Sequence, residues 1–137
     1  MKDNLIDLLK VEMKEIKNAS KILNISYKLC IKIGIKDNYS DAELMYFEGL
    51  TARFSRLSDI LIQKDLRTIM SIEMDRYDST RDLLNLSEKK NIISDSYKLA
   101  ETRIIRNKIV HEYVLENFEN IFKDVIILTP FLLKDVK

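Results

Sequence analysis

The sequence of 137 residues has little of several residue types, with two glycines, one proline, one cysteine and one histidine. The few glycines and prolines disfavour an all-β fold, which needs many turns, and an α/β fold with a glycine-rich nucleotide loop. Cys30 alone cannot form an internal disulfide, which is compatible with a reducing compartment. One histidine and one cysteine provide no cluster of zinc ligands, so we expect no metal site.

Neither sign of charge dominates, because 23 basic and 22 acidic residues give a net charge of +1. This balance excludes a strongly basic protein that coats nucleic acid, although it leaves room for a local basic site. Long apolar runs are also lacking. The N-terminal region does not resemble a signal peptide, and the uncharged stretches are too short to span a membrane. We therefore expect a cytoplasmic protein without membrane contact.

Apolar residues at helical spacing run through most of the chain, which is 46% hydrophobic and 33% charged. This pattern predicts an all-α fold, an antiparallel bundle of about five helices in one domain spanning residues 1–137. The expected helices cover residues 3–33, 41 to about 71, one or two short segments within 75–95, about 96–111 and about 116–129.

Local signals mark several helix ends. Gly34 fits the position just past a helix C-terminus, and Ser40 with Glu43 forms a capping-box pattern. Pro130 is expected to end or kink the last helix. Gly49 lies inside the second helix, where glycine costs about 1 kcal/mol relative to alanine, so we expect another helix to approach it closely.

The single histidine lies in a short motif formed by Arg106, Asn107, His111 and Tyr113. Asn107 and His111 are four residues apart and share a helix face, so the amide could orient the imidazole. Arg106 and His111 are about 140° apart on an ideal helix. Two chains related by a two-fold axis could bring both side chains into one cleft, which favours a homodimeric site.

The residue types in this motif suit the cleavage of RNA. Arginine binds phosphate oxygens through a bidentate fork, and histidine transfers protons near neutral pH. His111 could take a proton from a 2′-hydroxyl while Arg106 stabilises charge on the phosphoryl oxygens. DNA lacks that hydroxyl, so the predicted substrate is RNA. Further candidate contacts to RNA or to a protein partner are Arg103, Arg53 and Arg56.

The segment from Arg106 to Tyr113 resembles the R-x4-H-x-Y signature of HEPN toxins of the HepT type, which are encoded beside a minimal nucleotidyltransferase (MNT) antitoxin. Residues 50–59 are similar to the second helix of MNT-paired HEPN proteins, and residues 83–88 fit as well. The resemblance covers roughly residues 44–113. It implies an all-α homodimer with the motif at its interface and metal-independent RNase activity. By this resemblance Arg106 and His111 are catalytic, and Asn107 supports them.

The resemblance also implies a control mechanism. The partner nucleotidyltransferase would transfer AMP from ATP to Tyr113, placing a bulky negative group within reach of Arg106. No cofactor is expected in the chain itself, because the partner uses the ATP.

Two other functions are compatible with the same residues. The near-neutral charge fits a non-catalytic module that binds substrate, or acts as a scaffold, for a minimal nucleotidyltransferase. Alternatively, the chain is a structural adaptor in which the motif serves as a dimer contact. Loss of RNA cleavage without loss of dimerisation in an Arg106 variant would separate the RNase from the adaptor.

Overall fold

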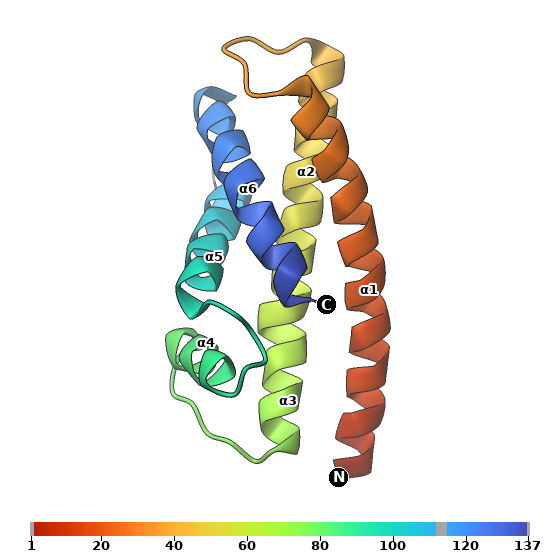
Figure 1. The fold of residues 1–137 in the computed structure, drawn as a ribbon, viewed down its shortest axis with the longest axis vertical. Coiled ribbons are helices and arrows are strands. Elements are labelled where there is room, and N and C mark those ends of the chain that lie inside the picture. The colour runs from red at the N-terminus through yellow and green to blue at the C-terminus, as the bar shows by residue number, and fades with distance from the viewer. Residues whose placement is uncertain (1, 112–114, 137) are drawn as a thin grey trace.

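The fold is built from helices packed around a shared core, and the computed structural model describes residues 2–111 and 115–136 (Figure 1). In chain order the elements are α1 (Lys2–Ile33), α2 (Asp41–Asp59), the π-helical segment η1 (Ile60–Asp65), α3 (Leu66–Ile72), α4 (Thr80–Lys89), α5 (Ser96–His111) and α6 (Leu115–Asp135). Because α2, η1 and α3 follow one another without a break, the described residues form five helical rods and no strand. The predicted all-α bundle is confirmed.

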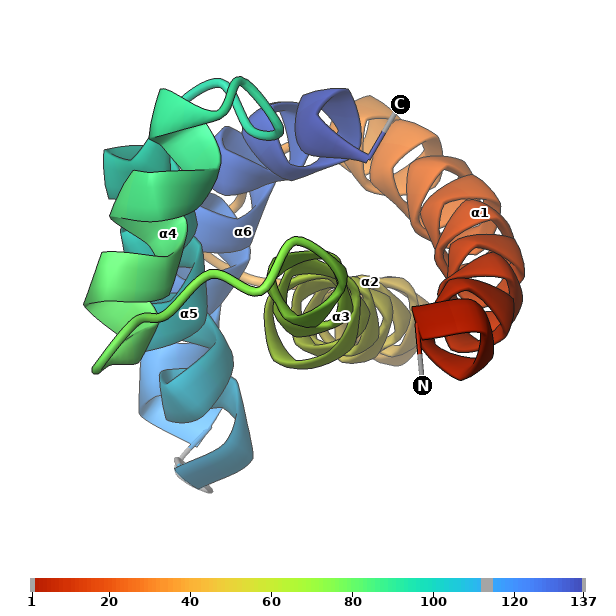
Figure 2. The same ribbon diagram turned by 90° about the horizontal axis from the view of Figure 1, so that it is seen from below.

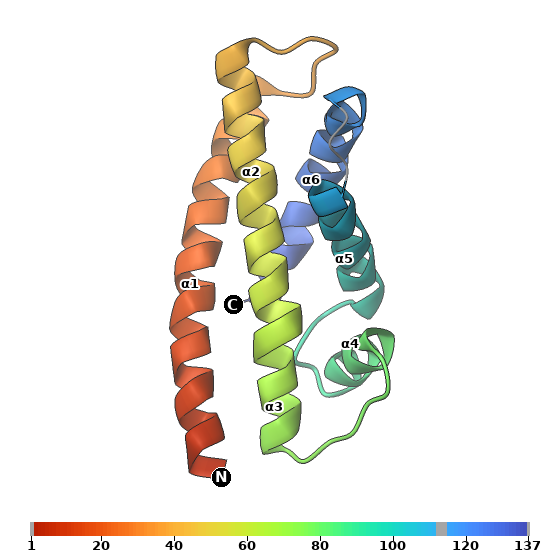
Figure 3. The ribbon, with the colours of Figure 1, turned by 180° about the vertical axis from the view of Figure 1, so that it is seen from behind.

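The rod made by α2, η1 and α3 lies at the centre of the molecule. Seen from below, α1, α6 and α5 curve around it and leave one side of the rod uncovered (Figure 2). Figure 3 shows this uncovered side, with α1 along one edge of the rod and α5 along the other. Exposed side chains of α2 include Met45, Ala52 and Arg56. The uncovered side of the rod, bordered by α1 and α5, forms one open face of the molecule (Figure 3).

Helix α1 is continuous because no glycine or proline interrupts its 32 residues. It buries one stripe at alternating spacings of three and four residues, formed by Glu12, Ile16, Ala19, Leu23, Ser26 and Cys30. Gly34 follows with a φ of 80°, and its N–H donates to the Cys30 carbonyl at 2.9 Å. A left-handed glycine that satisfies a terminal carbonyl is a common helix end, so the predicted helix over 3–33 is confirmed.

The second predicted helix also begins where expected. The Ser40 hydroxyl accepts from the Glu43 N–H at 3.2 Å, and the Glu43 carboxylate accepts from the Ser40 N–H at 2.9 Å. The predicted close approach to Gly49 is wrong within the chain, because no atom of another described helix lies within 4 Å of a Cβ placed there. Gly49 faces an open region and leaves space beside α2.

Pro130 does not end the last helix, since α6 continues to Asp135. An interior proline removes one backbone hydrogen bond, at a cost of about 3 kcal/mol. Burial offsets this cost, because Leu128 and Leu132 on either side of the proline are only 3% and 0% exposed. The Thr129 hydroxyl donates to the Val125 carbonyl at 2.6 Å in the preceding turn. Tertiary packing therefore extends the helix beyond the predicted end at residue 129.

A buried pair of carboxyl groups lies between α1 and the central rod. Glu12 and Asp65 are 4% and 5% exposed, and the Thr68 hydroxyl donates to Glu12 Oε1 at 2.9 Å. Burial, the adjacent Glu12 carboxyl and the charge of Glu15 together raise the pKa of Asp65 to about 7, against the opposing charge of Lys64. Asp65 therefore keeps its proton in the folded state at pH values where it is ionised in the unfolded chain.

This pair predicts a stability difference that depends on pH. The contribution of Asp65 to the free energy of unfolding is fully present below about pH 4 and is lost as the pH rises through about 7. The reason is that, between these two pH values, the folded state binds more protons than the unfolded state. Asp65→Asn should therefore match the wild type at about pH 4 and exceed its free energy of unfolding at about pH 8. Urea denaturation of both proteins across this range measures the difference. A difference that does not change with pH would contradict the assignment.

Candidate functional site

The motif residues Arg106, Asn107 and His111 lie on the second half of α5. The Asp95 carboxylate accepts from the N–H groups of Tyr97 and Lys98 at 3.0 and 3.2 Å, which satisfies donors in the first turn of this helix. Arg106 and Asn107 are partly buried, whereas His111 is exposed at the C-terminal end of α5. Tyr113 lies outside the described residues.

Arg106 is held by contacts at all three of its guanidinium nitrogens. Its Nε lies 2.7 Å from Asp59 Oδ1, and its Nη2 donates to Asp59 Oδ2 at 2.9 Å. Its Nη1 donates to Asn107 Oδ1 at 3.2 Å. Each Nη nitrogen carries two N–H groups and uses one of them in these hydrogen bonds, so one N–H on Nη1 and one on Nη2 remain for a further acceptor. Asp59 on α2 thus orients the guanidinium from a position 47 residues away in sequence.

A hollow of about 300 Å³ opens beside this ion pair, and we call it the Arg106 hollow. Its lining residues are Ser58, Asp59, Ile62, Gln63, Lys64, Arg103, Arg106 and Asn107. Arg103 is exposed one turn before Arg106, and both side chains line the same hollow. Three cationic side chains and one carboxylate line it, so the hollow carries a net positive charge and suits an anion such as a phosphate.

The π-helical segment η1 supplies one wall of the hollow. It begins directly after Asp59, and it provides Ile62, Gln63 and Lys64 to the lining. π-Helical turns are rare in proteins, and those that do occur are often found at functional sites. Such a turn changes the direction in which neighbouring side chains point. The π-helical segment therefore lies next to the Arg106–Asp59 pair, in the same region as the motif on α5.

Asn107 makes a different contact from the expected one. Its side-chain oxygen accepts from Arg106, and the hydrogen bonds of the described residues include none between Asn107 and His111. Nor does Arg106 share a hydrogen bond with His111 among the described residues, which agrees with their offset around the helix. Within one chain the structure joins Arg106 to Asp59 and Asn107, and it leaves His111 apart.

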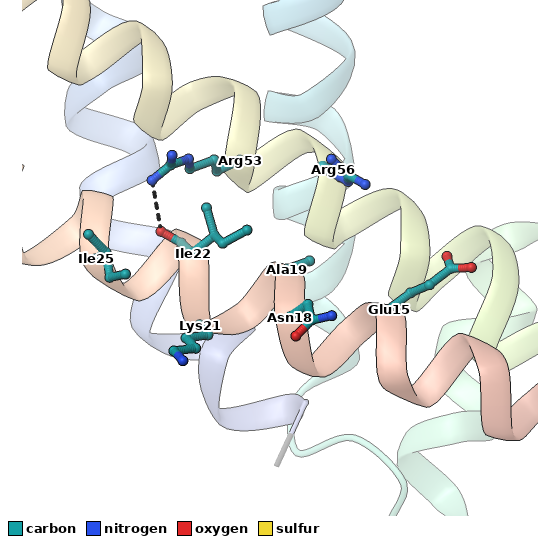
Figure 4. Close-up of a pocket in the computed structure, with 8 residues that line it drawn as sticks. All are labelled: Glu15, Asn18, Ala19, Lys21, Ile22, Ile25, Arg53 and Arg56. Atoms are coloured by element: carbon teal, nitrogen blue, oxygen red, sulfur yellow. Dashed lines mark hydrogen bonds between the residues drawn. The ribbon is translucent and has the colours of Figure 1, made fainter.

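Arg53 and Arg56 lie at a second hollow, of about 640 Å³, between α1 and α2 (Figure 4). We call it the α1–α2 hollow, and it is lined by Glu15, Asn18, Ala19, Lys21, Ile22, Ile25, Arg53 and Arg56. Arg53 Nη1 donates to the Ile22 carbonyl at 3.2 Å and to the Ser26 hydroxyl at 2.9 Å. Of the predicted contact residues, Arg103 therefore lies beside Arg106, whereas Arg53 and Arg56 line the separate hollow between α1 and α2.

A third depression, of about 400 Å³, lies between the two hollows. It shares Glu15 and Arg56 with the α1–α2 hollow, and Asp59 and Lys64 with the Arg106 hollow. Lys64 donates to Glu15 at 3.2 Å across this depression. The three depressions form one continuous strip across the open face of the molecule.

Sequence reasoning did not select Asp59, Gln63 or Lys64 as site residues. Asp59 lies in the segment 50–59 that carries part of the resemblance, yet nothing in the local sequence pairs it with Arg106. A contact between residues 47 positions apart depends on how α2 packs against α5.

No helix in the described part of the chain is long and apolar enough to cross a membrane. The described residues also contain no group of three histidine, cysteine, aspartate or glutamate side chains placed to hold a metal ion. Comparisons with protein-family models, with curated proteins and with solved structures found no match to this chain.

Proposed function

We propose that this chain is the toxin of a HEPN/MNT toxin–antitoxin system and acts as a metal-independent endoribonuclease. The observation that carries the proposal is the Arg106 guanidinium, which Asp59 and Asn107 hold at the edge of a basic hollow. A fixed guanidinium with two N–H groups left over is suited to a phosphoryl oxygen, and it needs little reorganisation during reaction. The only histidine of the chain follows on the same helix.

The reaction proceeds through the 2′-hydroxyl of RNA. His111 accepts the proton of this hydroxyl, the 2′-oxygen forms a bond to phosphorus, and the bond from phosphorus to the 5′-oxygen breaks. A proton passes to the leaving 5′-oxygen, so the products are a 2′,3′-cyclic phosphate and a 5′-hydroxyl. Arg106 stabilises the charge that develops on the phosphoryl oxygens.

The site is completed in a homodimer. Arg106 and His111 diverge on α5, so a second copy provides the histidine that faces a given arginine. Arg103 extends the cationic surface along the RNA backbone. The roles of Arg53 and Arg56 as RNA or partner contacts remain predictions. Nη1 of Arg53 already donates hydrogen bonds to Ile22 and Ser26 on α1.

Incubation of purified chain with RNA in the presence of EDTA tests this proposal. We expect cleavage products that end in a 2′,3′-cyclic phosphate, and we expect Arg106→Ala to lose cleavage while remaining folded and dimeric. Absence of cleavage by the wild type would favour the scaffold function. Dissociation of the Arg106→Ala dimer would instead favour the adaptor function.

Asp59→Asn is expected to reduce cleavage by about 10–100-fold, because the neutral amide no longer holds the guanidinium in place. Circular dichroism should show unchanged helix content, since both partners are partly exposed. Glu48→Gln is the matched control, because Glu48 is an exposed carboxylate on the same helix away from the hollow. Faster cleavage by Asp59→Asn would mean that Asp59 restrains Arg106 instead of positioning it.

Control of the toxin is proposed to occur at Tyr113. Co-expression with the neighbouring nucleotidyltransferase should add one or more AMP units to the chain, and intact-mass measurement should find none in Tyr113→Phe. The added phosphate would compete with RNA for Arg106 and repel the RNA backbone. A mass gain that persists in Tyr113→Phe would place the modification elsewhere.

A further inference from the structure

A second apolar stripe runs along α1 outside the buried core. Its large aliphatic side chains are 39–54% exposed, and they are Leu8, Val11, Ile22, Ile25 and Leu29. Glu15 and Asn18 fill the two intervening positions, so the spacing alternates between three and four residues over the helix. This is the spacing with which one helix packs along another. We call these seven residues the α1 stripe.

The α1 stripe is separate from the core stripe of the same helix. From Val11 onward each stripe residue precedes a buried core residue by one position, as Ile22 precedes Leu23 and Leu29 precedes Cys30. One residue corresponds to about 100° of rotation, so the stripe faces outward beside α2. Figure 4 shows Ile22 and Ile25 near Arg53 at the α1–α2 hollow.

Cationic side chains border the α1 stripe on both sides. Lys14, Lys21 and Lys28 each precede a stripe residue by one position, so they form a row on the side away from the core. All three are exposed. On the other side, α2 contributes Arg53 and Arg56 to the hollow. The surface is therefore an apolar groove between two basic edges.

We propose that the α1 stripe binds an amphipathic helix of another protein whose own apolar stripe is flanked by aspartate and glutamate side chains. Such a helix would bury its apolar residues against Ile22 and Ile25 and place its carboxylates beside Lys21 and Arg56. The space beside Gly49 further along α2 allows close approach of an incoming backbone. This inference depends on the groove alone and is independent of the RNase proposal.

Charge and shape favour this occupant over two others. Two α1 stripes packed antiparallel around a two-fold axis at Asn18 would bring Lys14 of each chain beside Lys21 of its copy, which is repulsive. A membrane surface is flat, whereas this site is hollow and has the charged Glu15 within the stripe. A helix with acidic edges meets neither difficulty.

The test uses the full-length chain and a labelled synthetic helix of about three heptads, with leucine at positions a and d and glutamate at positions e and g. A second peptide carries lysine in place of the glutamates. Fluorescence anisotropy should give tighter binding of the acidic peptide by about tenfold or more. Ile25→Gln should weaken that binding by about tenfold, because it removes a large buried aliphatic group from the contact.

Ile31→Gln is the matched control, because Ile31 is 49% exposed on α1, as Ile25 is 51% exposed, but lies outside the stripe. Ile31→Gln should leave the binding of the acidic peptide unchanged. Lys21→Glu should weaken the binding of the acidic peptide and strengthen the binding of the basic peptide. Equal binding of both peptides, an equal effect of Ile31→Gln, or no binding at about 1 mM peptide would overturn the proposal. The proposal would also be overturned if Ile25→Gln dissociated a wild-type dimer, since the stripe would then bind a second copy of the chain. It would be overturned as well if the wild type bound lipid vesicles and Ile25→Gln abolished that binding.

Discussion

Replacing His111 with alanine is expected to lower the rate of RNA cleavage by about 10²–10⁴-fold, which is the usual contribution of a general base. The free energy of unfolding should stay within about 0.5 kcal/mol of the wild type, because the side chain is exposed at the end of α5. Initial rates on a defined RNA, together with urea denaturation, measure both quantities. Lys108→Ala is the control, since Lys108 is an exposed cation on the same helix.

The same variant tests whether the site is shared between two chains. If each site takes Arg106 from one chain and His111 from the other, a mixed dimer of Arg106→Ala and His111→Ala contains one intact site. Equal mixing should then restore about a quarter of the wild-type activity, since half of the dimers are mixed. A mixture as inactive as either variant alone would place both groups in one chain. Unimpaired cleavage by His111→Ala would remove the histidine from the mechanism.

Replacing Phe47 with alanine is expected to lower the free energy of unfolding by about 3–5 kcal/mol. Phe47 is completely buried, and its ring centroid lies 5.0 Å from that of Tyr39 and 4.8 Å from that of Phe122. These rings join α2, the segment before it and α6, so the substitution leaves a cavity where three segments meet. For a chain of this length the melting temperature should fall by about 10–20 °C.

Tyr46→Ala provides the comparison for Phe47. Tyr46 is the preceding residue on α2, but it is 50% exposed, so its loss should change stability by no more than about 1 kcal/mol. Thermal and urea denaturation of the two variants distinguish core packing from a general loss of aromatic surface. Similar losses in both variants would show that the Phe47 contacts do not dominate the core.

The helices and most of their ends could be predicted because their signals are local. Alternation of apolar and polar residues, the glycine after α1 and the capping box before α2 act over a few residues each. The end of α6 could not be predicted in this way. Pro130 is a local signal to stop, and burial of Leu132 by other helices overrides it.

For the candidate site, the sequence by itself determined the motif on α5 and the offset between Arg106 and His111 around that helix. Only the tertiary structure decided that Asp59 holds Arg106, that Arg53 and Arg56 lie at a different hollow, and that Gly49 faces open space. It also introduced the π-helical segment beside Asp59, for which the sequence pattern has no signal. The physical reason is the separation along the chain of the residues that interact. Helix periodicity and capping depend on residues that are neighbours in sequence, whereas ion pairs and hollows between helices depend on how distant segments pack together.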